Sequence, residues 1–194
     1  MPLCAAGDAR RAPTFLAMIE HDPRCDVSEQ KILADVAQYG WHVMKVLEKA
    51  DSPGWAYSIG LYRAFRHPEI VVFGLNGDLM HAIINFIGQD IRSGKGFEPD
   101  KKYADLIEGY LCTFKTVSVA WYYPFLGYAN WFYKGMDYPV LQCIWPDKKS
   151  LYPWDSGFNP NWVYAQPLLF HNEPVSARTT AWLRSMNIDA GNEH

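Results

Sequence analysis

A buried strand that leads directly into an amphipathic helix is the feature that most constrains the fold. Residues 70–75 form an uninterrupted apolar run, which is typical of a central strand. The helix is predicted from Asn76 to about Arg92. On its apolar side, residues at i, i+4 spacing form a row, which consists of Leu79, Ile83, Ile87 and Ile91. Three further apolar residues broaden this row, namely Met80, Ile84 and Phe86. His81, Asn85 and Gln89 fall on the other side, so the helix is expected to pack on a sheet.

A second helix is predicted before the first strands. Asp26 can accept hydrogen bonds from free N–H groups at its start, and the apolar positions continue to about Gln38. Gly40 stands where a left-handed residue commonly ends a helix.

An antiparallel hairpin is predicted next. Residues 41–47 and 55–61 alternate in side-chain character, and Asp51-Ser52-Pro53-Gly54 between them is a turn sequence. The small residues Ala56, Ser58 and Gly60 share one face of the second strand, where a ligand or another backbone can approach closely.

The second half of the chain predicts less regular structure. Strands are expected at residues 111–118 and 140–145, with a short aromatic helix at 125–133 between them. Residues 146–166 are rich in Pro, Gly, Asn and Asp, which favours an ordered loop. Residues 166–170 are expected to return to the sheet edge.

These elements predict a single α+β domain with a mostly antiparallel sheet of about five strands, packed helices and a long aromatic-rich loop. We expect the domain to occupy residues 26–170, after a flexible or loosely docked arm at 1–25. Residues 171–194 are predicted to hold a C-terminal helix, at about 176–186, and a tail.

Composition restricts the classes of function. With 18 basic and 21 acidic residues, the chain has no net positive field for nucleic acid. It has no apolar run of the ~20 residues that a membrane span needs. The four cysteines have neither zinc-finger nor disulfide-framework spacing, so we expect a cytoplasmic protein with reduced thiols, without metal or cofactor.

Half of the chain's aromatic residues lie between 121 and 164, which suits either a core or a half-exposed interface. Two Trp/Pro/Asp triplets, 145–147 and 153–155, flank a short basic loop there. The binding residues predicted in this region are Trp131, Gln142, Trp145, Asp147, Tyr152, Trp154 and Asp155.

Two pairs of side chains are candidates for acid–base catalysis. His67 and Glu69 lie in a loop around Pro68, and could instead belong to an ordinary proline turn with solvated side chains. Asp147 and Asp155 could converge across a cleft, as in hydrolases that use two carboxylates. The structural alternative is that each Asp accepts hydrogen bonds from backbone N–H groups in its own turn.

Several separate motifs occur in the order found in a bacterial family of uncharacterised proteins, the domain of unknown function four-two-six-two. They are Tyr57-Ser58-Ile59-Gly60-Leu61, His67-Pro68-Glu69, Val72-Phe73-Gly74-Leu75, Gln142 with Trp145-Pro146-Asp147, Tyr152-Pro153-Trp154-Asp155, and Gln166-Pro167-Leu168-Leu169. The chain resembles this family over residues 28–170, and the resemblance implies no activity. It implies glycine where this chain has Ser150, which puts a left-handed turn there in question.

The start of the match is also similar in pattern to suppressor-of-fused type domains, which occur among immunity proteins that neutralise secreted toxins. The sequence is rich in Trp and Tyr, which are enriched at protein interfaces, and has no recognisable catalytic set. Our leading hypothesis is therefore a cytoplasmic bacterial protein-binding module that occupies a toxin or another protein through the aromatic, mildly acidic surface of residues 121–164. The alternatives are a hydrolase-like enzyme that uses the His/Glu or Asp/Asp pair, and a homodimer that buries its aromatic residues against a second copy.

Overall fold

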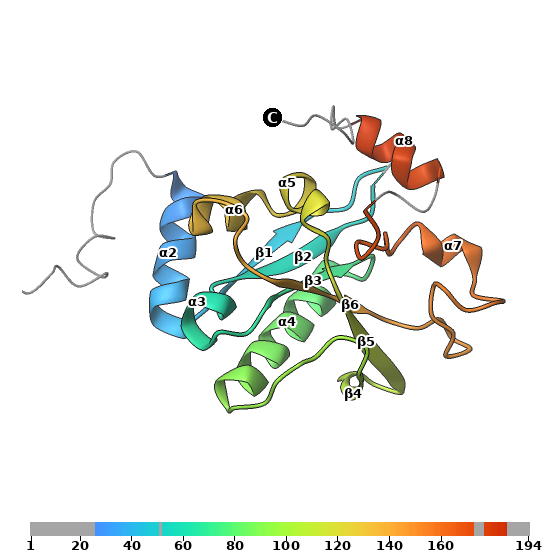
Figure 1. Cartoon of the computed structure of the whole chain (residues 1–194), viewed down its shortest axis with the longest axis horizontal. Helices are drawn as coiled ribbons and strands as arrows, with labels where there is room; N and C mark the ends of the chain where they lie inside the picture. Colours follow the sequence, from blue (N-terminus) through green and yellow to red (C-terminus); the bar gives the residue numbers. More distant parts are fainter. Residues whose placement is uncertain (1–25, 51, 173–176, 186–194) are drawn as a thin grey trace, which may run out of the picture.

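The computed structural model describes residues 26–50, 52–172 and 177–185 (Figure 1). One six-stranded sheet, in the order β1-β2-β3-β6-β5-β4, forms its centre. Only the pair β3 and β6 is parallel, and the other four pairs are antiparallel. The prediction of a mostly antiparallel α+β fold is confirmed, with six strands rather than about five.

The strands are β1 His42–Val46, β2 Trp55–Ile59, β3 Glu69–Phe73, β4 Lys102–Ile107, β5 Tyr110–Thr116 and β6 Val140–Ile144. The helices are α2 Val27–Tyr39, α3 Leu61–Phe65, α4 Gly77–Arg92, the 3₁₀ turn η1 Val119–Trp121, α5 Tyr122–Phe125, α6 Gly127–Tyr133, α7 Pro160–Val163 and α8 Ala177–Ser185. The arm expected at 1–25 lies outside the described residues.

Helices cover both faces of the sheet, so the core has two parts. On one face α4 packs across β1, β2 and β3 (Figure 1). On the other face lie side chains of α2, η1, α5, α6 and α8, including Trp182 and Leu183 of α8. The predicted central strand is β3, whose five residues are all buried between the two layers.

Local signals locate the ends of α2 correctly. Asp26 and Glu29 form a capping box, in which Asp26 Oδ1 accepts from Glu29 N at 2.8 Å and Asp26 N donates to Glu29 Oε2 at 2.9 Å. Gly40 ends the helix with φ 94°, and its N–H donates to Val36 O.

Three expectations need correction. Leu79 and Phe86 do not belong to the buried side of α4, because both are 41% exposed. The strand β4 was missed altogether, since an edge strand with mostly exposed residues carries no apolar pattern. Residues 166–170 follow the sheet without forming a strand.

Candidate functional site

Glu69 is fully buried at the start of β3, and its carboxylate accepts four hydrogen bonds. Gly60 N and Tyr62 N donate to Oε1 at 2.8 and 3.1 Å, and Tyr133 Oη donates to the same oxygen. Ser58 Oγ donates to Oε2. The end of β2, the start of α3 and the helix α6 thus meet at one carboxylate.

Burial raises the pKa of Glu69, because an ionised carboxylate loses its hydration there. The hydrogen bonds from Ser58, Tyr133, Tyr62 and Gly60 favour the ionised form and oppose this shift. Burial, together with the nearby Glu69, also raises the pKa of Tyr133, so its hydroxyl keeps its proton and donates. In this contact Tyr133 is therefore the donor and the carboxyl group of Glu69 the acceptor.

His67 does not share a hydrogen bond with Glu69. Its Nε2 accepts from Phe97 N at 3.0 Å, and its Nδ1 lies 2.8 Å from Pro68 O, so Nδ1 carries the proton. Both ring nitrogens are therefore used to hold the main chain at Phe97 against the start of β3.

Asp147 and Asp155 each bind the backbone of their own loop. Asp147 Oδ1 accepts from Lys149 N at 2.8 Å and Leu151 N at 3.0 Å, and Oδ2 accepts from Asn159 N at 3.3 Å. Asp155 Oδ2 accepts from Tyr152 N at 2.8 Å. These bonds are the ones that the structural alternative expected.

The four catalytic candidates lie at two ends of the sheet. Since β3 and β6 are parallel, Glu69 lies at the amino end of this pair and Asp147 follows its carboxyl end. A five-residue strand separates the ends by about 16 Å. The structure therefore does not bring the His67/Glu69 pair together with the Asp147/Asp155 pair.

Of the predicted binding residues, Gln142 and Trp145 are buried and bonded to main chain. Gln142 Nε2 donates to Pro167 O at 2.7 Å, and its Oε1 accepts from Leu169 N at 2.9 Å. Trp145 is 5% exposed, and its Nε1 donates to Phe73 O at 2.9 Å. Trp131 is half-buried in α6. A binding role for these residues stays a prediction.

Trp154 is the most exposed of the predicted binding residues, at 43%. It stacks on Tyr152 with ring centroids 5.2 Å apart and 7° between the planes, and Phe170 meets it edge to face at 5.8 Å. Lys115 Nζ lies 5.2 Å from the Trp154 centroid, and Lys102 Nζ lies 5.0 Å from that of Tyr152. We call these five residues the Trp154 surface.

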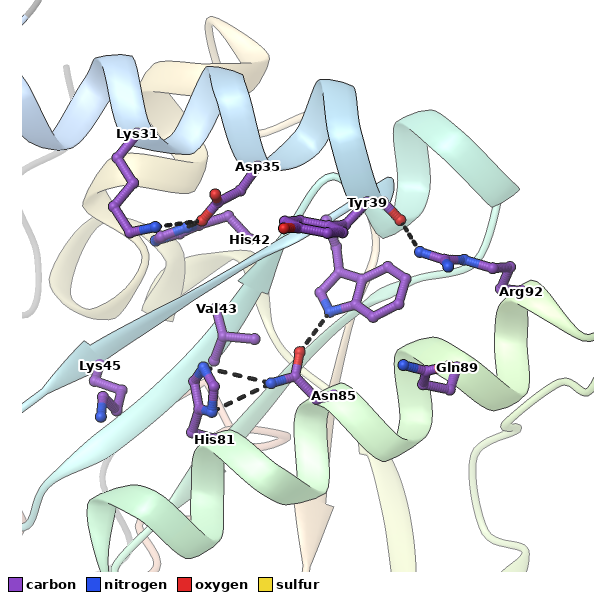
Figure 2. Close-up of a pocket in the computed structure, with 11 residues that line it drawn as sticks. Lys31, Asp35, Tyr39, His42, Val43, Lys45, His81, Asn85, Gln89 and Arg92 are labelled. Carbon is purple, nitrogen blue, oxygen red and sulfur yellow. Dashed lines mark hydrogen bonds and ion pairs between the residues drawn. The ribbon is translucent and has the colours of Figure 1, made fainter.

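A second site, which the sequence analysis missed, is a groove of about 420 Å³ beside β1 (Figure 2). We call it the β1 groove. Three elements line it: Lys31, Asp35 and Tyr39 come from α2, and His81, Asn85, Gln89 and Arg92 come from α4. Between the helices lie His42, Val43 and Lys45 of β1, together with Trp41, which directly precedes that strand. The i, i+4 spacing in both helices makes two facing rows.

At the α2 side of the β1 groove, His42 and Asp35 form a close pair. His42 Nδ1 lies 2.7 Å from Asp35 Oδ2, which also accepts from Lys31 Nζ at 2.9 Å. Burial lowers the pKa of His42 and outweighs the attraction of Asp35, so the imidazole is neutral near pH 7. Burial alone would raise the pKa of Asp35, but the bonds from His42 and Lys31 lower it, so Asp35 stays ionised.

The other end of the groove is closed by Arg92. Its guanidinium donates to Tyr39 O and lies 4.8 Å from the Trp41 ring centroid. Trp41 Nε1 donates to Asn85 Oδ1 at 3.0 Å, and the ring covers Gly88 of α4. The sequence does contain one signal for this site. Asp35 and His42 lie on either side of Gly40, where the predicted helix ends and the predicted strand begins, so the two side chains could be expected to lie close together.

Within residues 26–50, 52–172 and 177–185, no three His, Cys, Asp or Glu side chains lie together as metal ligands. No helix in these ranges is long and apolar enough to cross a lipid bilayer.

The fold and its sites define a single-sheet α+β protein with a polar groove and an exposed aromatic surface. The model of the family described as Domain of unknown function (DUF4262) matches residues 35–159, and the chain belongs to this family. No curated protein and no solved structure matches the chain significantly.

Proposed function

We propose that this protein is a cytoplasmic binding module for another protein, and that the partner contacts the Trp154 surface. The exposure of a Trp ring that is already fixed in place carries the proposal. Tryptophan and tyrosine are enriched among the residues that contribute most to interface affinity. Tyr152 is held by its Oη, which donates to Leu111 O at 2.9 Å, so Trp154 rests on a rigid support.

Preorganisation supports this choice of surface over the rest of the aromatic segment. A ring that is already stacked loses little rotamer freedom on binding, whereas a mobile one pays about 0.5–1.5 kcal/mol. Leu111, 46% exposed on β5, provides further apolar area beside Tyr152. Other aromatic residues of the segment, such as Trp121 and Phe125, are buried in the core and are not accessible to a partner.

The charge beside the rings is mixed, whereas the sequence suggested a mildly acidic surface. Lys102 and Lys115 contact the rings, but Lys115 Nζ also pairs with Asp100, and Asp155 lies in the same loop. An acidic group of the partner is therefore expected to contact Lys102. We propose a secreted bacterial toxin as the partner, neutralised by being covered, on the pattern similarity to suppressor-of-fused type immunity domains.

The test compares two exposed aromatic residues. Tagged wild-type protein, Trp154→Ala and Tyr123→Ala would be used to recover partners from the native host. Tyr123 is 76% exposed in α5, so its replacement is a matched control. We expect a stoichiometric partner with the wild type and Tyr123→Ala. Its affinity, measured by calorimetry on purified proteins, should fall about 30-fold or more with Trp154→Ala, as for an interface anchor.

Equal affinity of the two variants would overturn the proposal. Light scattering separates the remaining possibility of self-association. If Trp154→Ala converts a wild-type dimer into a monomer and no other partner is recovered, the surface joins two copies of this chain and the toxin-binding role fails. Trp145→Ala is unsuitable as a binding test, because Trp145 is buried.

A further inference from the structure

The β1 groove lies at the open edge of the sheet. β1 is the first strand in the sheet order, and among the described residues it pairs only with β2. His42 faces α2, whereas Val43 and Lys45 face α4, so side chains from both faces of the strand line one groove. Figure 2 shows α2 above β1 and α4 below it, with the labelled side chains directed into the space between.

His42 has one ring nitrogen without a hydrogen bond to any described residue. The side chain is 10% exposed, and Nδ1 is taken by ionised Asp35, which can only accept, so Nδ1 carries a proton. In the described ranges, every side-chain nitrogen or oxygen that is buried from solvent has a hydrogen-bond partner. The free atom, Nε2, is therefore not sealed from solvent, and His42 is one of the residues that line the groove.

The groove is positively charged in an acidic chain. Its lining has three cationic side chains, Lys31, Lys45 and Arg92, and one carboxylate, Asp35, and these four side chains together carry a net charge of +2. The whole chain has a net charge of −3. Because fields in a concave, low-dielectric site are focused, this local excess attracts anions.

Two of these cations have donors available. Lys45 Nζ is paired with Asp78 at 3.2 Å, but that carboxylate is 93% exposed, so water competes for it. Arg92 donates to Tyr39 O, which leaves most of its five N–H donors unused by that bond. The Trp41 ring, which is 5% exposed, and Val43 add a small apolar area to the lining.

We propose that the β1 groove is a binding site for a small organic anion, with its carboxylate or phosphate at His42 Nε2 and its apolar part toward Trp41 and Val43. A site of 300–1,000 Å³ with apolar walls and a few convergent polar groups is typical of small-molecule binding. This site is separate from the Trp154 surface, so either proposal can fail alone.

The binding should take up a proton. An anion accepts a hydrogen bond from Nε2 only when His42 is doubly protonated, and its charge favours that form. The other charged or titratable groups facing His42 are Lys31 and Asp35 from α2 and His81 from α4. Asp35 favours the imidazolium, whereas Lys31 and His81 oppose it. Affinity should therefore rise as pH falls from 7.5 to 6.

The test titrates phenyl phosphate, benzoate and inorganic phosphate into protein labelled with nitrogen-15, and follows the imidazole resonances. We expect a saturable shift of His42 and a rise in its pKa. Phenyl phosphate and benzoate should bind more tightly than inorganic phosphate, because their rings reach the apolar lining. His42→Gln should weaken benzoate binding about tenfold, as for a lost charge-assisted hydrogen bond, and remove its pH dependence, because benzoate itself stays ionised between pH 6 and 7.5.

Lys45→Met and Lys149→Met are matched variants that each remove one positive charge. Lys149 is exposed in the loop after β6, whereas Lys45 lines the groove. We expect weaker binding with Lys45→Met only. Equal effects of the two, or a His42 resonance that does not move, would overturn the proposal. If His42→Gln does not fold, the two lysine variants and the wild-type pH dependence decide the outcome.

Discussion

The side-chain amide of Gln166 forms two hydrogen bonds with the main chain of Trp145, in the way that a neighbouring strand would. Its Oε1 accepts from Trp145 N at 3.0 Å, and its Nε2 donates to Trp145 O at 2.9 Å. Gln142 of β6 does the same for Pro167 O and Leu169 N. Two buried amides thus replace backbone pairing where the chain follows the sheet without becoming a strand.

Replacing Gln166 with Glu should destabilise the protein strongly. A carboxylate cannot donate to Trp145 O, and it adds an uncompensated charge at a position that is 0% exposed. We expect a loss of about 3 kcal/mol in the free energy of unfolding. Urea denaturation of Gln166→Glu against Gln38→Glu, the same change at an exposed position on α2, gives the measurement. Similar midpoints for the two would contradict the role assigned to the amide.

Glu69 should be replaceable by Gln but not by Ala. Glu69→Ala leaves the N–H groups of Gly60 and Tyr62 without their acceptor, which costs about 1–3 kcal/mol each when buried. Gln retains an acceptor oxygen and resembles the protonated acid. Thermal unfolding should therefore show a large loss of stability for Glu69→Ala and a small change for Glu69→Gln.

The sign of the pH dependence follows from the raised pKa of Glu69. Its folded-state pKa lies above the ordinary value of 4.5, so its contribution to stability is present below pH 4.5 and lost as pH rises through the folded-state pKa. As pH rises above 4.5, the free energy of unfolding of Glu69→Gln should increase relative to that of the wild type. The exposed control Glu48→Gln should run parallel to the wild type, and a parallel curve for Glu69→Gln would contradict the raised pKa.

Local signals predicted much of the fold, because they act over a few residues. The cap at Asp26, the left-handed Gly40 and the apolar run of β3 need no tertiary information. The site residues could not be predicted in the same way. Glu69 accepts a hydrogen bond from Tyr133, which lies 64 residues later in the chain. The β1 groove is lined by residues of both α2 and α4, which are also far apart in the sequence. The strand β4 was missed for a different reason, because its mostly exposed residues carry no apolar pattern, although its partner β5 follows after only two residues.

Replacing Ser150 with glycine should make the folded protein more stable. The resemblance to the family left a left-handed turn in question here, and the structure has one, with φ 63°. Only glycine adopts this conformation without crowding of a Cβ, and Ser150 is exposed, so no buried contact is lost. Ser150→Gly should stabilise the protein by about 0.5–1 kcal/mol. The same change at Ser156, an exposed position at which no left-handed φ occurs, should not stabilise. Equal effects in urea denaturation would contradict the strain argument.

The pair of His42 and Asp35 should make stability depend on pH. The pKa of His42 is lowered from 6.5, so the unfolded chain takes up the proton first as pH falls. The contribution of His42 is therefore fully present above pH 6.5 and is lost as pH falls through its folded-state pKa. His42→Gln should flatten the stability curve below pH 6.5, whereas His171→Gln, at an exposed position, should not.

Asp35→Asn separates burial from charge at the same pair. Burial lowers the pKa of His42 and Asp35 opposes it, so removing the carboxylate should lower this pKa further. Nuclear magnetic resonance titration of the His42 ring in the wild type and in Asp35→Asn measures both values in the native state. A higher pKa in Asp35→Asn would mean that His42 Nδ1 does not donate to this carboxylate in solution. The groove would then present a different ring nitrogen to its ligand.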